Sequence, residues 1–106
     1  MAVKNLALKF SGEKVTIGGT EYVAAPLPIG KMKLIVSAFD PEKVTEDEMF
    51  ENMIFFIHAS IARNHNDITI EDIEDNMTIA EASELFQKII VLSGATPSTE
   101  KKMTKK

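Results

Sequence analysis

Apolar and polar residues alternate with a period of two in the first third of the chain. Leu6, Leu8 and Phe10 occupy every second position of the run NLALKF, which predicts a strand. Two further β-rich runs, Lys14–Ile17 and Thr20–Ala24, flank a Gly-Gly pair. A two-residue Gly-Gly loop suits a type I′ turn, because both central residues of that turn need a positive φ. The pattern therefore predicts that these two runs pair as an antiparallel hairpin.

The hydrophobic period changes to that of a helix after Pro28. Residues before prolines are pushed out of the helical region, so the segment APLP should leave the hairpin in an extended form. Gly30-Lys31 then marks the start of a helix that Asp40-Pro41 ends. Its apolar stripe at i, i+3, i+4 and i+7 consists of Met32, Ile35, Val36 and Phe39.

The longest predicted helix follows Thr45. Thr45 and Glu48 form a capping box, and the three acids of the segment EDE favour the positive end of the helix dipole. The helix should run for about 18 residues, or ~27 Å, until the segment NHND stops it. Its predicted core stripe consists of Phe50, Met53, Ile54, Ile57 and Ile61.

Two shorter helices complete the pattern. Thr69 with Asp72 predicts the start of a helix over Ile70–Asn76, and Thr78 with Glu81 predicts the start of the last helix. The last helix ends at Gly94, a typical residue after a helix C-terminus. Its apolar face consists of Ala82, Leu85, Phe86, Ile89 and Leu92.

These elements predict an α+β fold, with a small N-terminal antiparallel hairpin or sheet followed by a bundle of about four helices. The chain has 106 residues, a length typical of one domain, which we place at residues 1–94. Residues 95–106 lack apolar periodicity and are predicted to be a disordered basic tail. Deleting Thr96–Lys106 should therefore leave the fold intact.

The charge is distributed unevenly. Residues 95–106 carry four lysines against Glu100, so their charge is +3, and the rest of the chain carries −7 because the total is −4. An acidic body is repelled by nucleic acids and by anionic membranes, so neither is expected as a partner, whereas a basic protein surface would be attracted. The chain has no cysteine, which fits a reducing cytoplasm, and no apolar run reaches the length of a membrane span.

No motif for catalysis, a metal or a cofactor is complete. The segment around Gly30-Lys31 lacks the first glycine and the final hydroxyl of a phosphate-binding loop, and its two prolines remove backbone donors. His58 and His65 are seven residues apart, and Asp67 would have to be a third metal ligand, whereas zinc-binding pairs on helices lie at i, i+4. The predicted helical segments contain serines without a catalytic base placed next to them or an elbow motif, namely Ser37, Ser60, Ser83 and Ser93. We therefore expect no enzyme activity, metal or cofactor.

The long helix has more apolar surface than one core stripe needs. At 100° per residue, Phe55 lies about 160° from Ile57, with Ala59 and Ala62 beside it. Such a helix is either central or has a second face that binds a partner or another copy of the chain. Alternatively, Phe55 lies under the N-terminal hairpin.

The order of these segments resembles the tail assembly chaperones of long-tailed bacteriophages. In that family an apolar strand pair around Gly-Gly-x-x-Tyr leads into a Pro-Leu motif, helices, an Arg-Asn-x-x-Asp-Φ-Thr phrase (Φ is apolar) and a final Ser-Gly. The resemblance covers residues 14–94, and the chain departs from it at His65-Asn66, where an aromatic residue followed by proline is common. The matching residues are Val15, Ile17, Gly18, Gly19, Tyr22, Pro26, Leu27, Arg63, Asn64, Asp67, Ile68, Thr69, Ser93 and Gly94.

The resemblance implies a non-enzymatic chaperone of the host cytoplasm that is absent from the mature virion. It would bind and solubilise the tape measure protein and recruit tail tube subunits, and many such proteins also have a frameshifted longer form. Phe55, Ala59 and Ala62 would grip apolar helices of the client. The acids that would keep the complex soluble and steer basic segments are Glu71, Asp72, Glu74 and Asp75.

Two alternatives belong to other functional classes. A structural tail or head-tail connector protein would remain in purified particles. An acidic regulatory decoy would bind the basic groove of a DNA-binding protein, and its acids should then follow a phosphate-like spacing. The acids here cluster at helix starts, where capping explains them.

Overall fold

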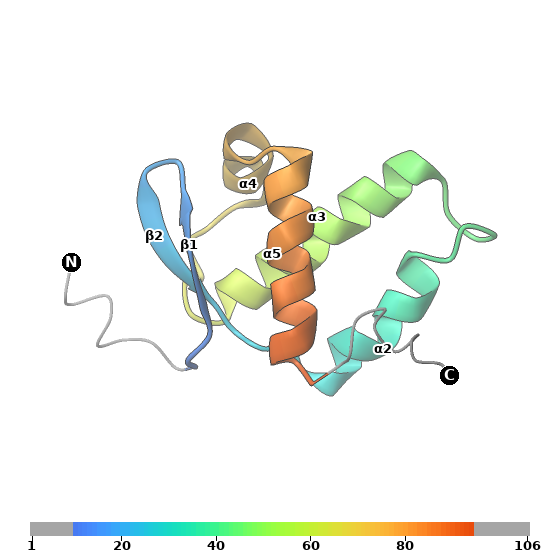
Figure 1. Cartoon of the computed structure of the whole chain (residues 1–106), viewed down its shortest axis with the longest axis horizontal. Coiled ribbons are helices and arrows are strands. Elements are labelled where there is room, and N and C mark those ends of the chain that lie inside the picture. Colours follow the sequence, from blue (N-terminus) through green and yellow to red (C-terminus); the bar gives the residue numbers. More distant parts are fainter. Residues whose placement is uncertain (1–9, 95–106) are drawn as a thin grey trace.

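The structure, a computed structural model, describes residues 10–94. Within this range a two-stranded antiparallel sheet is followed by four helices, which confirms the predicted α+β class (Figure 1). The predicted strand over NLALKF lies outside the described residues except for Phe10, which is in a bend, and the C-terminal segment 95–106 also lies outside them.

The hairpin forms as the sequence predicts. Strand β1 (Glu13–Ile17) pairs with β2 (Thr20–Ala24), and Ile17 lies opposite Thr20 across a two-residue loop. The loop glycines have φ values of 60° and 83°, the positive values that a type I′ turn requires. Side chains on one face of this hairpin, including buried Ile17, face the helices.

A second glycine position depends on tertiary contact rather than on a turn. The segment that leads into β1 crosses close to the end of β2, and a Cβ atom on Gly12 would lie 1.8 Å from the carbonyl oxygen of Ala24. Real Cβ atoms do not approach an oxygen so closely. Only glycine therefore allows the two segments to meet here.

The four helices have the predicted order. Helix α2 (Ile29–Ala38) begins directly after Pro28 without a side-chain cap, whereas each of the other three begins at a threonine. All three predicted capping boxes are confirmed, with both reciprocal hydrogen bonds formed at 2.8–3.1 Å. These helices are α3 (Glu46–Ala62), α4 (Ile70–Asn76) and α5 (Ile79–Leu92), and Gly94 follows α5 with a φ of 99°.

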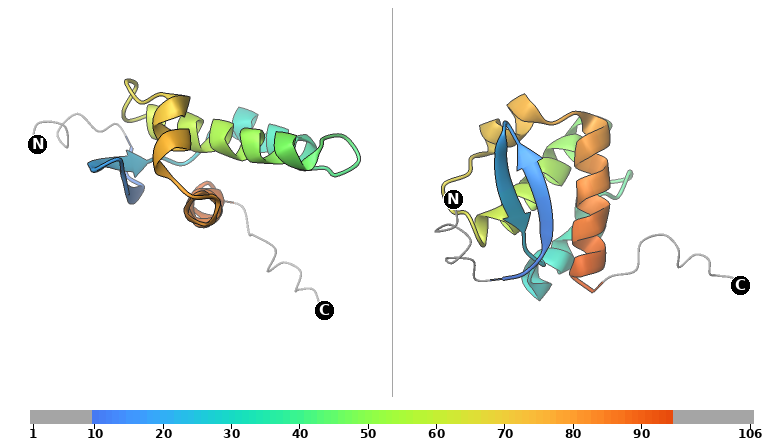
Figure 2. Two further views of the ribbon diagram at one scale, coloured as in Figure 1. Left: turned by 90° about the horizontal axis from the view of Figure 1, so that it is seen from above. Right: turned by 60° about the vertical axis from the view of Figure 1, so that its left-hand side comes forward.

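Helix α3 is the centre of the packing. The hairpin and α5 lie on the same side of it in both views of Figure 2, while α2 and α4 lie near opposite corners of the molecule (Figures 1 and 2). The core contains residues from the hairpin and from α3, α4 and α5. Its largest fully buried apolar side chains are Phe56, Ile57, Ile61, Ile73 and Ile89.

The predicted core stripe of α3 is wrong at one end and incomplete in the middle. Phe50 is 36% exposed, because the first turns of α3 extend beyond α5 (Figure 1). Phe56, which the stripe omits, is only 2% exposed. Its ring lies 6.1 Å from Phe39 and 6.2 Å from Phe86, so it joins the end of α2 to α5.

Candidate functional site

An apolar groove lies between α2, the loop after it and α3. Its volume is about 380 Å³. Phe55 of α3 is 43% exposed and Leu34 of α2 is 52% exposed, so both apolar side chains are open to solvent. We call this feature the α2–α3 groove, and its lining residues are Leu34, Ser37, Ala38, Lys43, Val44, Asn52, Phe55 and Phe56.

Helix α2 leaves apolar surface uncovered on both of its flanks. No residue of α2 is fully buried, and its contact with the core is made through half-buried Met32, Ile35 and Ala38. Leu34 lies on one flank and Val36 on the other, since residues two positions apart are separated by ~160° around a helix. Val36 is 78% exposed, so the prediction that it belongs to the inward stripe is wrong. A helix covered on so narrow a face leaves room for a further apolar partner.

The predicted grip residues are not equally accessible. The exposed ring of Phe55 packs edge-on against buried Phe56 at 5.3 Å, which holds it in place at the groove. Ala59 and Ala62 are half-buried and pack against the core. The chain that leaves β2 covers this half of α3, as shown by the hydrogen bond between Ser60 and the Ala25 carbonyl at 2.6 Å. Phe55 is therefore the main contributor of apolar surface among the three.

The predicted acidic residues on α4 do not adjoin the groove. Glu71, Glu74 and Asp75 are exposed, but Asp72 is half-buried and caps its own helix. Helix α4 lies at the opposite corner of the molecule from α2 (Figure 1). The sequence prediction therefore combined two surfaces that the fold keeps apart.

Other acids lie nearer the groove. Glu51 and Glu48 precede Phe55 by four and seven residues, which places them on the same side of α3. Glu51 is exposed, while one oxygen of Glu48 accepts the N–H of Thr45 at 2.8 Å. Among the described residues, Lys43 from the preceding loop is the one charged residue that lines the groove itself, and these acids lie beyond it along α3.

Arg63 and Asn64, the Arg-Asn pair of the resemblance, hydrogen-bond to distant backbone segments just after α3. The Asn64 side chain accepts the N–H of Phe10 at 2.9 Å and donates to the carbonyls of Phe10 and Val23 at 2.8 and 3.1 Å. Nε2 of His65 accepts the N–H of Val23 at 2.9 Å. Arg63 donates to the carbonyl of Pro26 and stacks over the Phe10 ring, with its guanidinium carbon 3.9 Å from the ring centroid.

The final Ser-Gly also connects distant segments. The hydroxyl of Ser93 accepts the N–H of Leu27 at 2.7 Å and donates to the Ile89 carbonyl at 2.6 Å. This pair ties the end of α5 to the segment that enters α2. The polar residues that carry the family resemblance at these two places therefore position the hairpin and α2 rather than face a ligand.

Both histidine side chains interact with backbone groups of the protein. A ring nitrogen of His58 lies 2.9 Å from the carbonyl oxygen of Ile68, and His65 holds Val23. Among residues 10–94, no three His, Cys, Asp or Glu side chains are grouped so that they could hold a metal ion. Within the same range, no helix is both long enough and apolar enough to cross a membrane.

Tyr22 has a perturbed pKa. Burial raises the pKa of its phenol, and the negative charges of Asp72 and Asp67 raise it further, while a hydrogen bond with Thr20 acts in the opposite direction. Its ring packs edge-on against His65 at a centroid distance of 5.2 Å. Tyr22 therefore belongs to the contact between the hairpin and the loop after α3, away from the α2–α3 groove.

Comparison of the chain with protein-family models, with curated proteins and with solved structures found no match. The described residues define an α+β protein with an open apolar groove between two helices. Such a groove is the usual receptor for one apolar face of an amphipathic helix. Leu34 and Val44, which the sequence analysis did not select, line it together with Phe55.

Proposed function

We propose that this protein is a non-enzymatic tail assembly chaperone of a long-tailed bacteriophage. In this proposal it acts in the host cytoplasm, is absent from the mature virion, binds apolar helical segments of the tape measure protein and helps recruit tail tube subunits. The observation that carries the proposal is the α2–α3 groove, where Phe55 and Leu34 expose apolar surface that the protein's own core does not use. The order of sequence motifs supports the same class of protein.

The groove has the chemistry that a helical client needs. Phe55 and Leu34 provide contact area, since an aromatic or aliphatic anchor in a groove usually supplies most of the binding energy. The acids on the same side of α3 add long-range attraction for basic segments and keep the complex dispersed. Their effect should appear in the association rate and weaken as salt increases.

Co-expression with the tape measure protein of the same phage tests the proposal. The tape measure protein should move from the insoluble to the soluble fraction and co-purify with this chain. Leu34→Glu and Phe55→Glu should each abolish this effect. Val36→Glu adds the same charge to the opposite flank of α2, where the wild-type side chain is 78% exposed, and should retain it.

Two outcomes would contradict the proposal that this protein is a chaperone. One is a tape measure protein that stays insoluble in the presence of the wild-type chain. The other is the presence of this chain in mature virions in stoichiometric amounts, which would replace the chaperone with a structural tail or connector protein. An acidic decoy has less support, because the carboxylates of Glu48, Asp72 and Glu81 are engaged in capping their own helices.

A further inference from the structure

The two outer edges of the hairpin differ in how their backbone groups are hydrogen-bonded. In a hairpin with a two-residue loop, the residues flanking the loop form a hydrogen-bonded pair, and bonded and non-bonded pairs then alternate. Ile17 and Thr20 flank the loop, so Lys14 and Val23 form a non-bonded pair. The backbone N–H and C=O groups of such a pair point away from the partner strand, toward the outer edges.

The outer edge of β2 is covered by side chains at Val23, whereas no described residue bonds the outward backbone groups of Glu21. The outward N–H of Val23 bonds to His65, and its outward C=O bonds to Asn64. On β1 the corresponding outward groups belong to Lys14 and Thr16. Among the described residues, no backbone segment or side chain hydrogen-bonds these groups. An unpaired edge of this kind is a template for another strand.

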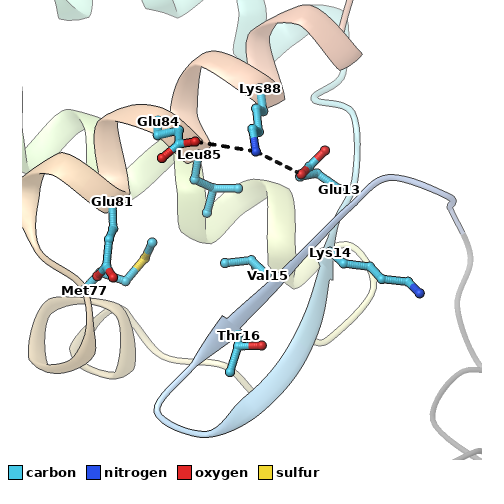
Figure 3. Close-up of a pocket in the computed structure, with 9 residues that line it drawn as sticks. All are labelled: Glu13, Lys14, Val15, Thr16, Met77, Glu81, Glu84, Leu85 and Lys88. Carbon is cyan, nitrogen blue, oxygen red and sulfur yellow. Dashed lines mark ion pairs between the residues drawn. The ribbon is translucent and has the colours of Figure 1, made fainter.

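The open edge of β1 faces a groove rather than bulk solvent alone. Figure 3 shows Val15 of β1 and Leu85 of α5 pointing toward each other across it, with Met77 near one end. At the other end Lys88 bridges Glu13 at 3.4 Å and Glu84 at 3.7 Å. The groove has a volume of about 180 Å³ and a strand on one side with a helix on the other. A groove of this size can hold one or two side chains of an extended segment whose backbone pairs with the edge of β1.

The chain itself contains a segment with the matching pattern. Residues 4–9, KNLALK, place Leu6 and Leu8 on one face of a strand and end in lysines. The leucines fit the apolar floor of the groove, which includes Val15 and Leu85. As a strand the six residues span about 20 Å, comparable to the ~17 Å of a five-residue strand such as β1.

The position of Phe10 decides which copy of the chain supplies this segment. Both backbone groups of Phe10 bond to Asn64, which lies at the outer edge of β2. Phe10, the residue that follows this segment, therefore lies on the opposite side of the hairpin from the groove of its own chain. We propose that residues 4–9 of a second copy add to β1 as a third strand, so that two copies exchange N-terminal strands. Reciprocal exchange closes a two-fold dimer and pairs the edge of β1 in both copies.

Engineered cysteines test this exchange directly, because the chain has none of its own. Side chains at 14 and 16 face the same side of the sheet as alternate residues of the added strand, here Asn5, Ala7 and Lys9. Full-length chains carrying Asn5→Cys, Ala7→Cys or Lys9→Cys are mixed separately with full-length Thr16→Cys chains. At least one mixture should form a disulfide between different chains, identified by mass spectrometry of the linked peptides. Glu21→Cys, one strand further away on β2, should form none with the same partners.

Two results from these cysteines would overturn the exchange. If no mixture cross-links at Thr16→Cys, the edge of β1 does not receive this segment. If Ala7→Cys with Thr16→Cys in one chain cross-links within that chain while the mixtures do not, the strand adds to its own hairpin. Cross-links of equal yield to Glu21→Cys would indicate random collision and would also contradict the proposal.

The oligomeric state provides an independent test that does not involve a phage client. Light scattering of the full chain should give the mass of a dimer. Leu6→Asp combined with Leu8→Asp should give a monomer with an unchanged circular dichroism spectrum, because these positions lie outside the described core. Thr16→Pro removes the outward N–H at the edge and should also give a monomer, whereas Thr16→Val retains it and should remain dimeric. A monomeric wild type, or a dimer that survives the leucine changes, would overturn the proposal even if the chaperone activity is real.

Discussion

The backbone N–H of Val23 donates a hydrogen bond of 2.9 Å to Nε2 of His65, a residue 42 positions later in the chain. The adjacent Asn64 accepts from Phe10 and donates to the carbonyl of Val23. Two side chains from the end of α3 thus take the place of a third strand along β2. Their effect is to orient the hairpin on α3, while the outward backbone groups of Lys14 and Thr16 on β1 bond to no described residue.

Asn64→Ala should destabilise the protein by about 1–3 kcal/mol. The change leaves the outward carbonyl of Val23 and both backbone groups of Phe10 without the Asn64 side chain, and a partly buried polar group that loses its partner costs about this much. Urea unfolding followed by circular dichroism measures the difference. Asn66→Ala changes an exposed residue of the same loop and should alter stability by no more than ~0.5 kcal/mol. Equal effects of the two changes would show that Asn64 does not hold the hairpin.

Gly12→Ala and Gly30→Ala should have effects of opposite sign. A Cβ on Gly12 would overlap the carbonyl oxygen of Ala24, so the chain must shift or unfold, with a loss of at least about 3 kcal/mol. Gly30 lies in the first turn of α2, and a Cβ added there would meet no atom within 4 Å, so alanine should stabilise the protein by ~0.5–1 kcal/mol. Thermal unfolding of the two variants compares them. A tolerated alanine at Gly12 would contradict the close crossing of β2.

Phe55→Glu should leave the fold intact, whereas Phe56→Ala should lower the free energy of unfolding substantially. The exposed ring of Phe55 can be replaced at a cost within about 1 kcal/mol, since a carboxylate there stays in water. Phe56 is 2% exposed, and removing its ring leaves a cavity that costs about 3–5 kcal/mol. Denaturant midpoints measured side by side test this order. An unfolded Phe55→Glu variant would place Phe55 in the core and remove it from the proposed client surface.

Tyr22 should titrate above the ordinary tyrosine pKa. It is the one tyrosine of the chain, so the ultraviolet absorbance of phenolate reports this residue alone. Because folding raises its pKa, through burial and the charges of Asp72 and Asp67, the folded state retains this proton more strongly than the unfolded state. The corresponding stability is fully present below pH ~10 and is lost as the pH rises from there through the raised pKa.

Tyr22→Phe is the control for this titration. The variant should lose less stability than the wild type over the same alkaline range, because it has no phenol to ionise. Lysine deprotonation affects both proteins and cancels in the comparison. A phenolate titration at or below the ordinary value would contradict the influence of burial and of the two aspartates on Tyr22.

Several local features of this protein were determined by the sequence alone. Gly18-Gly19 requires positive φ values and sets the register of the hairpin, and each threonine cap satisfies donors only a few residues away. These interactions join residues that are close in the chain, so neighbouring residue types suffice to predict them. The same reasoning placed α4 at Ile70–Asn76 and the end of the last helix near Gly94.

The identity of the covered faces was decided only by the tertiary structure. Helix α3 is apolar around most of its circumference, so periodicity could not separate buried Phe56 from exposed Phe55 and Phe50. Which side is covered depends on where α5 and the chain after β2 pack against α3. Likewise, the need for glycine at Gly12 and the hydrogen bonds of Asn64 arise from segments that are distant in sequence. Those segments meet only after the chain has folded, because the bonds and contacts between them have no local signal in the sequence.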